Sequence, residues 1–261
     1  MINWDNFYIF VIITILCWGV ASLFSLFSNS LNRRKNFAVC LYIIGIIAMA
    51  TFIIGLGLYL KRPPMRTMGE IRLWYAFLLG IVGLIIYLRW NFSWILLFTS
   101  VLSSVFLIIN LIRPELHNQT LMPALQSIWF VPHVIIYMSS YALLGGSFFI
   151  ALYGLMKKNT NYLHACDQLV IAGTAFFTLA MLIGALWAKA AWGHYWTWDA
   201  KELWAAITWM IYLFYLHFRN FKSKSNKTSY VILIIAFIAL QMCWYGVNIF
   251  PSLKESLHSY I

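Results

Sequence analysis

The chain has 261 residues, of which 63% are hydrophobic and only 10% are charged, and its mean hydropathy is +0.81. This composition excludes a water-soluble globular protein, because apolar runs of roughly 17 to 25 residues, long enough to cross a bilayer as helices, recur along the chain. The formal net charge of +11 indicates topology signals and lipid-facing anchors in short loops, and it does not indicate a nucleic-acid partner.

The apolar runs predict an all-α, polytopic membrane protein with about eight transmembrane helices in a single integral-membrane domain, residues 1–261. The expected spans are Phe7–Phe27, Phe37–Leu60, Leu73–Leu88, Trp94–Ile112, Pro132–Leu155, Leu169–Trp187, Leu203–Phe218 and Tyr230–Ile249. The first span has no basic residue before it and no small-residue cleavage site after it, so we expect a retained helix. The distribution of Lys and Arg among the loops favours an N-terminus on the outer side of the membrane. The loop at residues 61–72 would then be an outer loop rich in cations, an exception to the positive-inside rule that we expect to serve function.

The segment from Trp187 to Trp209 has an unusual composition. It holds six of the thirteen tryptophans, and Gly193 and Asp199 interrupt it. One or two tryptophans at the end of a span anchor it at the headgroup level, but six at short steps cannot all face headgroups. A shelf of indoles suits a flat hydrophobic ligand. The sequence therefore predicts a binding loop at about residues 187–204.

Three histidines lie where they can act with this segment. His133 follows Pro132 at the start of the fifth expected span, and His258 lies in the C-terminal tail. Because two spans separate each of them from the tryptophans, all lie on one face of the membrane. His217 lies roughly 21 Å below Leu203 in the seventh span, and an ionisable side chain at that depth indicates function. Singly, each fits a surface or helix-end role, whereas a converging pair of imidazoles beside indoles favours axial ligation of haem iron.

The residues WGHYWTWDAKELWA, with a histidine on either side and YLHFR after them, resemble the tryptophan-rich WWD motif of haem-handling proteins. The chain is most similar to the CcsA (ResC) family of system II cytochrome c biogenesis. SIWFVPHVIIYMSSYALL around His133 resembles that family's first external histidine segment, VNIFPSLKESLHSY around His258 resembles its second, and LKRPPMRTMGEIR resembles an early external loop. These motifs cover most of the chain beyond residue 60.

The resemblance implies transport of haem b, as a bound substrate, and its presentation to apocytochrome c CxxCH motifs for thioether attachment. The chain would be the CcsA half of a CcsBA cytochrome c synthase, or haem lyase, with CcsB (ResB) as a separate partner. His133 and His258 would ligate an external haem, and His217 would hold haem inside the membrane with a histidine of CcsB. The shelf is implied to comprise Trp192, Gly193, Tyr195, Trp196, Trp198 and Asp199. No residue is assigned a catalytic role.

Several alternatives stay open. His194 can contact the ligand or solvent, and the nearby cations are either propionate partners or interfacial anchors, namely Arg66, Arg72, Lys189 and Lys201. The protein can be a CcmC-like donor of haem to a chaperone, a b-type electron-transfer subunit with a fixed haem, or a transporter with an aromatic gate. The resemblance to bacterial relatives implies a bacterial inner (cytoplasmic) membrane with the haem site on its outer face, and a thylakoid membrane is the alternative.

Overall fold

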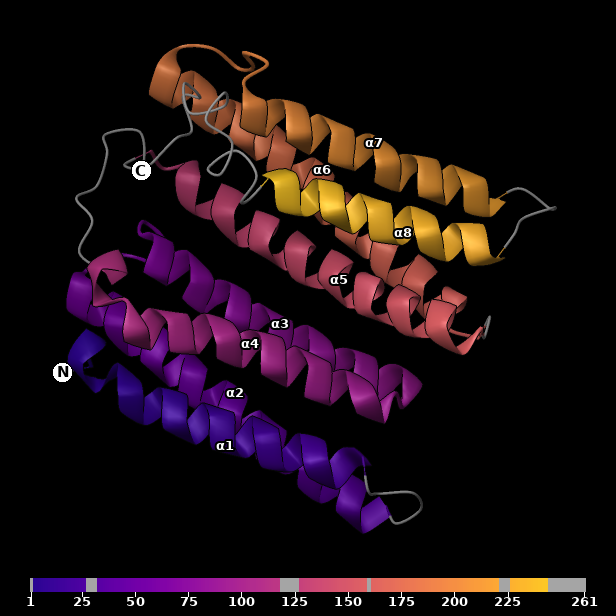
Figure 1. Cartoon of the computed structure of the whole chain (residues 1–261). Coiled ribbons are helices and arrows are strands. Elements are labelled where there is room, and N and C mark those ends of the chain that lie inside the picture. Colours follow the sequence, from indigo (N-terminus) through magenta and orange to yellow (C-terminus); the bar gives the residue numbers. More distant parts are fainter. Residues whose placement is uncertain (1, 27–31, 118–126, 159–160, 221–225, 244–261) are drawn as a thin grey trace. The chain divides into compact units, whose positions relative to one another are not determined.

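The computed structural model describes residues 2–26, 32–117, 127–158, 161–220 and 226–243. Within these ranges the regular secondary structure is entirely helical, and the chain divides into two compact units, Met1–Met122 and Pro123–Ile261 (Figure 1). The prediction of an all-α polytopic membrane protein is confirmed. Six helices, α1 to α6, are long and apolar enough to cross a membrane by length and composition.

The first unit consists, in its described residues, of four long helices and two short 3-10 helices. They are η1 (Trp4–Asn6), α1 (Phe7–Leu26), α2 (Asn32–Leu60), α3 (Met68–Trp90), α4 (Ser93–Ile112) and η2 (Pro114–His117). Helix α1 packs against α2 and α4, and α3 packs against the same two helices. Each long helix therefore contacts two others within the unit.

The indole of Trp18 on α1 lies at the centre of this packing and is completely buried. Its Nε1 donates to the carbonyl oxygen of Tyr42 on α2 at 3.1 Å. A Cβ atom added at Gly45 on α2 would lie 2.6 Å from the indole, and one added at Gly80 on α3 would lie 2.7 Å from it. The two glycines thus make room for Trp18 where three helices meet.

The second unit contains α5 (Phe130–Lys157), α6 (Leu163–Trp192), α7 (Ala200–Asn220) and α8 (Asn226–Gln241). Helix α5 packs along α6 and α8, and α7 also contacts both of these helices (Figure 1). The carboxylate of Asp167 on α6 accepts hydrogen bonds from Nε and Nη2 of Arg219 at 2.8 and 2.6 Å and from the hydroxyl of Tyr215 at 2.7 Å. This contact fastens the end of α7 to the beginning of α6.

The helices follow the expected spans in order, but several extend beyond them. Helix α6 begins at Leu163, before the expected Leu169, and it ends at Trp192, after the expected Trp187. The early start has a physical reason. Apolar side chains such as Leu163 are buried on one face of the helix while the other face is polar, so the apolar run in the sequence is shorter than the helix. The last expected span is described only to residue 243, and its remainder lies outside the described residues.

Candidate functional site

The tryptophan-rich segment is shared between two helices and a short connection. The segment predicted as a loop at about 187–204 comprises the last turns of α6, a connection at residues 193–199 and the first turn of α7. The tryptophans at 187 and 192 belong to α6, those at 204 and 209 belong to α7, and those at 196 and 198 lie between them. The connection between α6 and α7 is therefore short, and little backbone lies outside the two helices.

Gly193 ends α6 and turns the chain. Its φ is 84°, a left-handed conformation that glycine adopts without a steric penalty, and its N–H donates to the carbonyl oxygen of Lys189 at 3.1 Å. The Nζ of Lys189 donates to the carbonyl oxygen of Gly193 at 2.7 Å and lies 5.4 Å from the ring centroid of Tyr195. Lys189 therefore stabilises the turn, which favours a structural role over propionate binding.

The buried carboxylate of Glu202 holds the connection onto α7. Its Oε2 accepts hydrogen bonds from the N–H of Thr197 at 2.7 Å, the hydroxyl of Thr197 at 3.2 Å and the N–H of Asp199 at 3.3 Å. In return, Asp199 Oδ1 accepts the N–H of Glu202 at 3.0 Å, which completes a capping box. Sequence reasoning missed the role of Glu202, although an aspartate three residues before a glutamate is the signature of such a cap.

The indoles of the connection do not form a parallel stack. The rings of Trp196 and Trp198 meet edge-on, with centroids 5.7 Å apart and an interplanar angle of 83°. Trp198 has a φ of 61°, and 68% of its surface is exposed. His194 and Tyr195 are exposed as well. The tight turn thus directs neighbouring aromatic side chains apart and leaves an aromatic surface open at this end of the second unit.

Trp196 differs from its neighbours in burial. Its Nε1 is buried and has no hydrogen-bond partner among the residues that the structure describes. A buried indole N–H without an acceptor is energetically costly, and such groups in native proteins call for an explanation such as a ligand or ordered water. A role for Trp196 in donating a hydrogen bond to a bound molecule stays a prediction.

His133 lies in the first turn of α5 and contacts the C-terminal half of α6. Its Nδ1 lies 2.8 Å from the carbonyl oxygen of Ala180. Because a carbonyl oxygen only accepts, Nδ1 carries the proton and the lone pair of the neutral ring is on Nε2. The ring stacks on Trp187 with centroids 5.5 Å apart and an angle of 22°, and Trp187 meets Trp192 at 4.9 Å. The structure thus brings His133 together with two tryptophans of the segment.

The other two histidines are not joined to this group. His217 lies in the last turn of α7 with its side chain exposed, close in sequence to Arg219, which pairs with Asp167. Roughly 20 Å of helix separates Asp167 from the Ala180 carbonyl on α6, so His133 and His217 belong to different depths of the unit. His258 lies outside the described residues.

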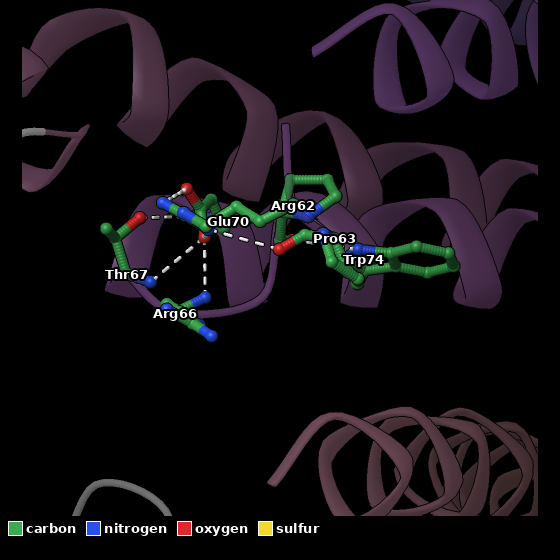
Figure 2. Close-up of polar contacts among 7 residues, drawn as sticks. Arg62, Pro63, Arg66, Thr67, Glu70 and Trp74 are labelled. Atoms are coloured by element: carbon green, nitrogen blue, oxygen red, sulfur yellow. Dashed lines mark hydrogen bonds and ion pairs between the residues drawn. The ribbon is translucent and has the colours of Figure 1, made fainter. Parts of the chain in front are cut away.

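The cation-rich loop at residues 61–72 belongs to the first unit and folds around Glu70, which is 1% exposed. Its carboxylate accepts Nη1 and Nη2 of Arg62 at 3.0 and 2.8 Å, together with the backbone N–H groups of Arg66 and Thr67 (Figure 2). Thr67 Oγ1 accepts the N–H of Glu70 at 3.2 Å and completes a capping box at α3. The Arg62 cation therefore has a structural role that the sequence alone does not disclose.

The two arginines considered as propionate partners differ from Arg62. Buried nitrogen atoms of these residues, Nε of Arg66 and Nη1 of Arg72, have no hydrogen-bond partner in the described part of the chain. A role for either arginine in binding an anion stays a prediction.

Comparison with known families bears directly on this arrangement. Residues 65–254 match the family described as Cytochrome C assembly protein. The chain belongs to the cytochrome c assembly protein family. The matched range includes His133, the whole tryptophan-rich segment and His217, and it ends shortly before His258.

Similar members of the cytochrome c assembly protein family carry the name Cytochrome c biogenesis protein CcsA, which confirms the resemblance drawn from the motifs. The protein of Chlamydomonas reinhardtii is 36% identical over 174 residues, which cover 62% of this chain and 48% of that protein. The protein of Mesostigma viride is 28% identical over 295 residues, covering 96% of this chain and 93% of that protein. The chain thus spans about half of the first relative and nearly all of the second.

A solved structure shares the fold. The chain is similar to Cytochrome c Heme Lyase CcmF with a TM-score of 0.73, over 93% of this chain and 46% of that chain, at 14% sequence identity. At this identity the likeness concerns the fold alone. This fold of the cytochrome c assembly protein family therefore also occurs within a longer chain.

Proposed function

We propose that this cytochrome c assembly protein binds haem on the outer side of its membrane and presents it to apocytochrome c. The setting of His133 carries the proposal. An imidazole whose Nδ1–H is held by a backbone carbonyl offers Nε2 to a metal, as the Nδ1 contact with Ala180 permits here. The stacked Trp187 and the neighbouring indoles provide the apolar surface that a macrocycle needs.

The proposed site uses two axial ligands, His133 and His258, and a surrounding aromatic surface. The residues proposed to line the haem are Trp192, Gly193, Tyr195, Trp196, Trp198 and Asp199. Two imidazoles saturate the coordination of the iron and thereby limit its reaction with oxygen. The surface positions the ring, which lowers the entropic cost of the reaction that follows.

The thioether addition is itself redox-neutral. The histidine of the apocytochrome CxxCH motif replaces one of the two axial ligands. Each cysteine S–H then adds across a vinyl C=C bond of haem, so that sulfur bonds to one carbon and the hydrogen goes to the other. The chain acts in this step by holding haem b, and we assign no general base to it.

The proposal includes a haem relay through His217 and a separate CcsB partner. Placing the haem propionates in hydrocarbon costs free energy. We therefore propose that ligands at successive depths hold the haem as it crosses the membrane. Ionisable side chains at membrane depth rarely face lipid, and the side chain of His217 is exposed on α7. Its exposure supports a ligand role shared with a histidine from another chain.

The CcsA names of the relatives favour this proposal over a CcmC-like haem donor. We propose a bacterial cytoplasmic membrane as the location. Relatives from Chlamydomonas reinhardtii and Trachelium caeruleum make a thylakoid membrane the alternative. Fractionation of the source cells distinguishes the two.

Visible absorption spectra of the protein purified with its partner test the proposal. We expect bis-histidine bands in the wild type that weaken in His133→Ala and in His258→Ala. His164→Ala is the control, because His164 is exposed at the start of α6 and contacts Gln168. His133→Gly should regain the bands when imidazole is added. A colourless wild type, or unchanged bands in both ligand variants, would overturn the ligand assignment.

Two further results separate the alternatives. Replacing His217 should lower haem delivery to the outer site, and normal loading in that variant would contradict the relay. Haem that stays bound through turnover and is reduced by quinol would instead identify a b-type electron-transfer subunit.

A further inference from the structure

The approach of His133 to α6 depends on a residue that has no side chain. Gly184 lies one turn after Ala180, and a Cβ atom added there would lie 2.7 Å from Cε1 and 2.8 Å from Nδ1 of His133. The imidazole is a rigid ring, so it would have to move away from the helix to admit a methyl group. Gly184 therefore opens the space through which His133 reaches the Ala180 carbonyl.

The acceptor itself belongs to the backbone of a regular helix. In α-helix geometry the carbonyl of Ala180 also pairs with the N–H of Gly184, since the two residues are four apart. A carbonyl oxygen has two lone pairs and can accept from both donors. The Nδ1 contact of His133 thus adds a second hydrogen bond to an intact turn of α6 and does not replace the first.

Three residues of α6 together form the surface that the ring meets. Ala180, Gly184 and Trp187 are spaced at i, i+4 and i+7, so they lie on one face of the helix. Ala180 supplies the acceptor, Gly184 the space and Trp187 the stacked ring at 5.5 Å. Glycine weakens a helix interior relative to alanine, so its presence here calls for a packing reason, and the imidazole provides one.

We propose that Gly184 and the carbonyl of Ala180 form a positioning site that fixes the tautomer and the rotation of His133 for ligation of haem iron through Nε2. This inference rests on the proposed haem ligation by His133 and deepens it. A hydrogen bond to the distal nitrogen of a ligating imidazole orients the ring and makes it a stronger donor to the metal. Gly184 acts through His133 and does not contact the haem.

The first test needs no haem. We use ¹⁵N NMR of the full-length, histidine-labelled protein in detergent, and the His133 signals are assigned by their loss in His133→Ala. The wild type should show the tautomer with hydrogen on Nδ1, and Gly184→Ala should lose that single state. An Nε2–H tautomer in the wild type would overturn the proposal, and this outcome does not require Gly184→Ala to fold.

Gly173→Ala is the matched control. Gly173 lies on the same helix, and its added Cβ would lie 2.6 Å from the side chain of Leu144 on α5, so both substitutions crowd the α5–α6 contact. This variant should keep the wild-type His133 signals. Equal changes in both variants would indicate a general loss of packing and would overturn the positioning role.

The second test measures haem. Relative to the wild type, Gly184→Ala should lower haem affinity by about tenfold or more, the usual cost of losing such a supporting contact, and should raise the midpoint potential. Gly173→Ala should change the potential little. In a His133→Ala background, Gly184→Ala should have no further effect, because the two residues act as one unit. Additive losses would overturn the positioning role while leaving haem ligation standing. Haem binding that does not depend on His133 would overturn both.

Discussion

Asp199 and Glu202 cap the same helix end by exchanging hydrogen bonds, with Asp199 Oδ1 accepting from the Glu202 N–H at 3.0 Å and Glu202 Oε2 accepting from the Asp199 N–H at 3.3 Å. Glu202 also accepts two hydrogen bonds from Thr197. One carboxylate therefore fixes the backbone on both sides of Trp198, the most exposed tryptophan of the connection.

Glu202→Ala should destabilise the protein by about 1–3 kcal/mol, because part-buried N–H groups of Thr197 and Asp199 lose their acceptor. Hydrogen exchange at residues 193–199 should accelerate more than exchange in α5. Glu202→Gln keeps a carbonyl oxygen in place and should lose less stability. If exchange in the connection is the same in wild type and Glu202→Ala, the carboxylate does not organise the loop.

The glycines around Trp18 give a second prediction. Gly45→Ala and Gly80→Ala each place a methyl group within 2.7 Å of the indole, so each should destabilise the first unit by about 1–3 kcal/mol through overpacking. Gly19→Ala is the control, because its added Cβ meets no atom within 4 Å. That change should be neutral or stabilise by up to about 1 kcal/mol, since alanine favours helices. Denaturation in detergent measures all three, and equal effects would contradict the role of the glycines.

The order of the helices could be predicted from the sequence because apolar runs of membrane length have few alternatives to a helix in lipid. The first and last residues of the helices could not be predicted in the same way, because a helix can extend beyond its apolar run where one face stays buried. Leu163 is buried at the start of α6 while its neighbour His164 is exposed, and mean hydropathy averages the two. Gly193 caps α6, which ends at Trp192 and so runs past the expected end at Trp187.

The contacts around His133 could be predicted only in part from the sequence. Counting spans predicts that His133 and the tryptophan segment lie on one face of the membrane, and the structure brings His133 against Trp187. The acceptor for its Nδ1 is a backbone carbonyl, which every residue possesses, so no residue type marks Ala180 in the sequence. The significance of Gly184 likewise depends on which helix packs across it.

His117 links stability to pH in the first unit. Its ring stacks on Trp4 with centroids 3.7 Å apart, and burial is the main cause that holds the pKa of His117 below its ordinary value of about 6.5. The unfolded chain takes up this proton near pH 6.5, whereas the folded chain takes it up only at lower pH. The free energy of unfolding is therefore highest above pH 6.5, where His117 is neutral in both states. It decreases as the pH falls from 6.5 through the pKa of the folded state.

We expect the wild type to lose more stability than His117→Phe when the pH is lowered from 7 to 5. The variant keeps an aromatic ring beside Trp4 but has no titrating group. Denaturation midpoints in detergent across this range provide the measurement. Parallel pH profiles for the two proteins would show that His117 titrates equally in the folded and unfolded states.

The pair of Arg62 and Glu70 yields the last prediction. Arg62→Ala should destabilise the protein by about 2 kcal/mol, because the buried Glu70 carboxylate loses two charged hydrogen bonds. Arg62→Lys keeps the charge but not the two-pronged geometry, so it should recover only part of the loss. Arg89→Ala is the control, since Arg89 is exposed at the end of α3, and it should change stability by less than about 0.5 kcal/mol.

Haem loading measured on the same variants distinguishes a structural arginine from a ligand-binding one. If Arg62 acts through Glu70, then Glu70→Gln should impair the loop as Arg62→Ala does, and the double variant should lose little more than either single one. If Arg62→Ala instead keeps full stability and loses haem, the guanidinium binds the ligand directly, and the cations of this loop are retained for haem and not for the fold.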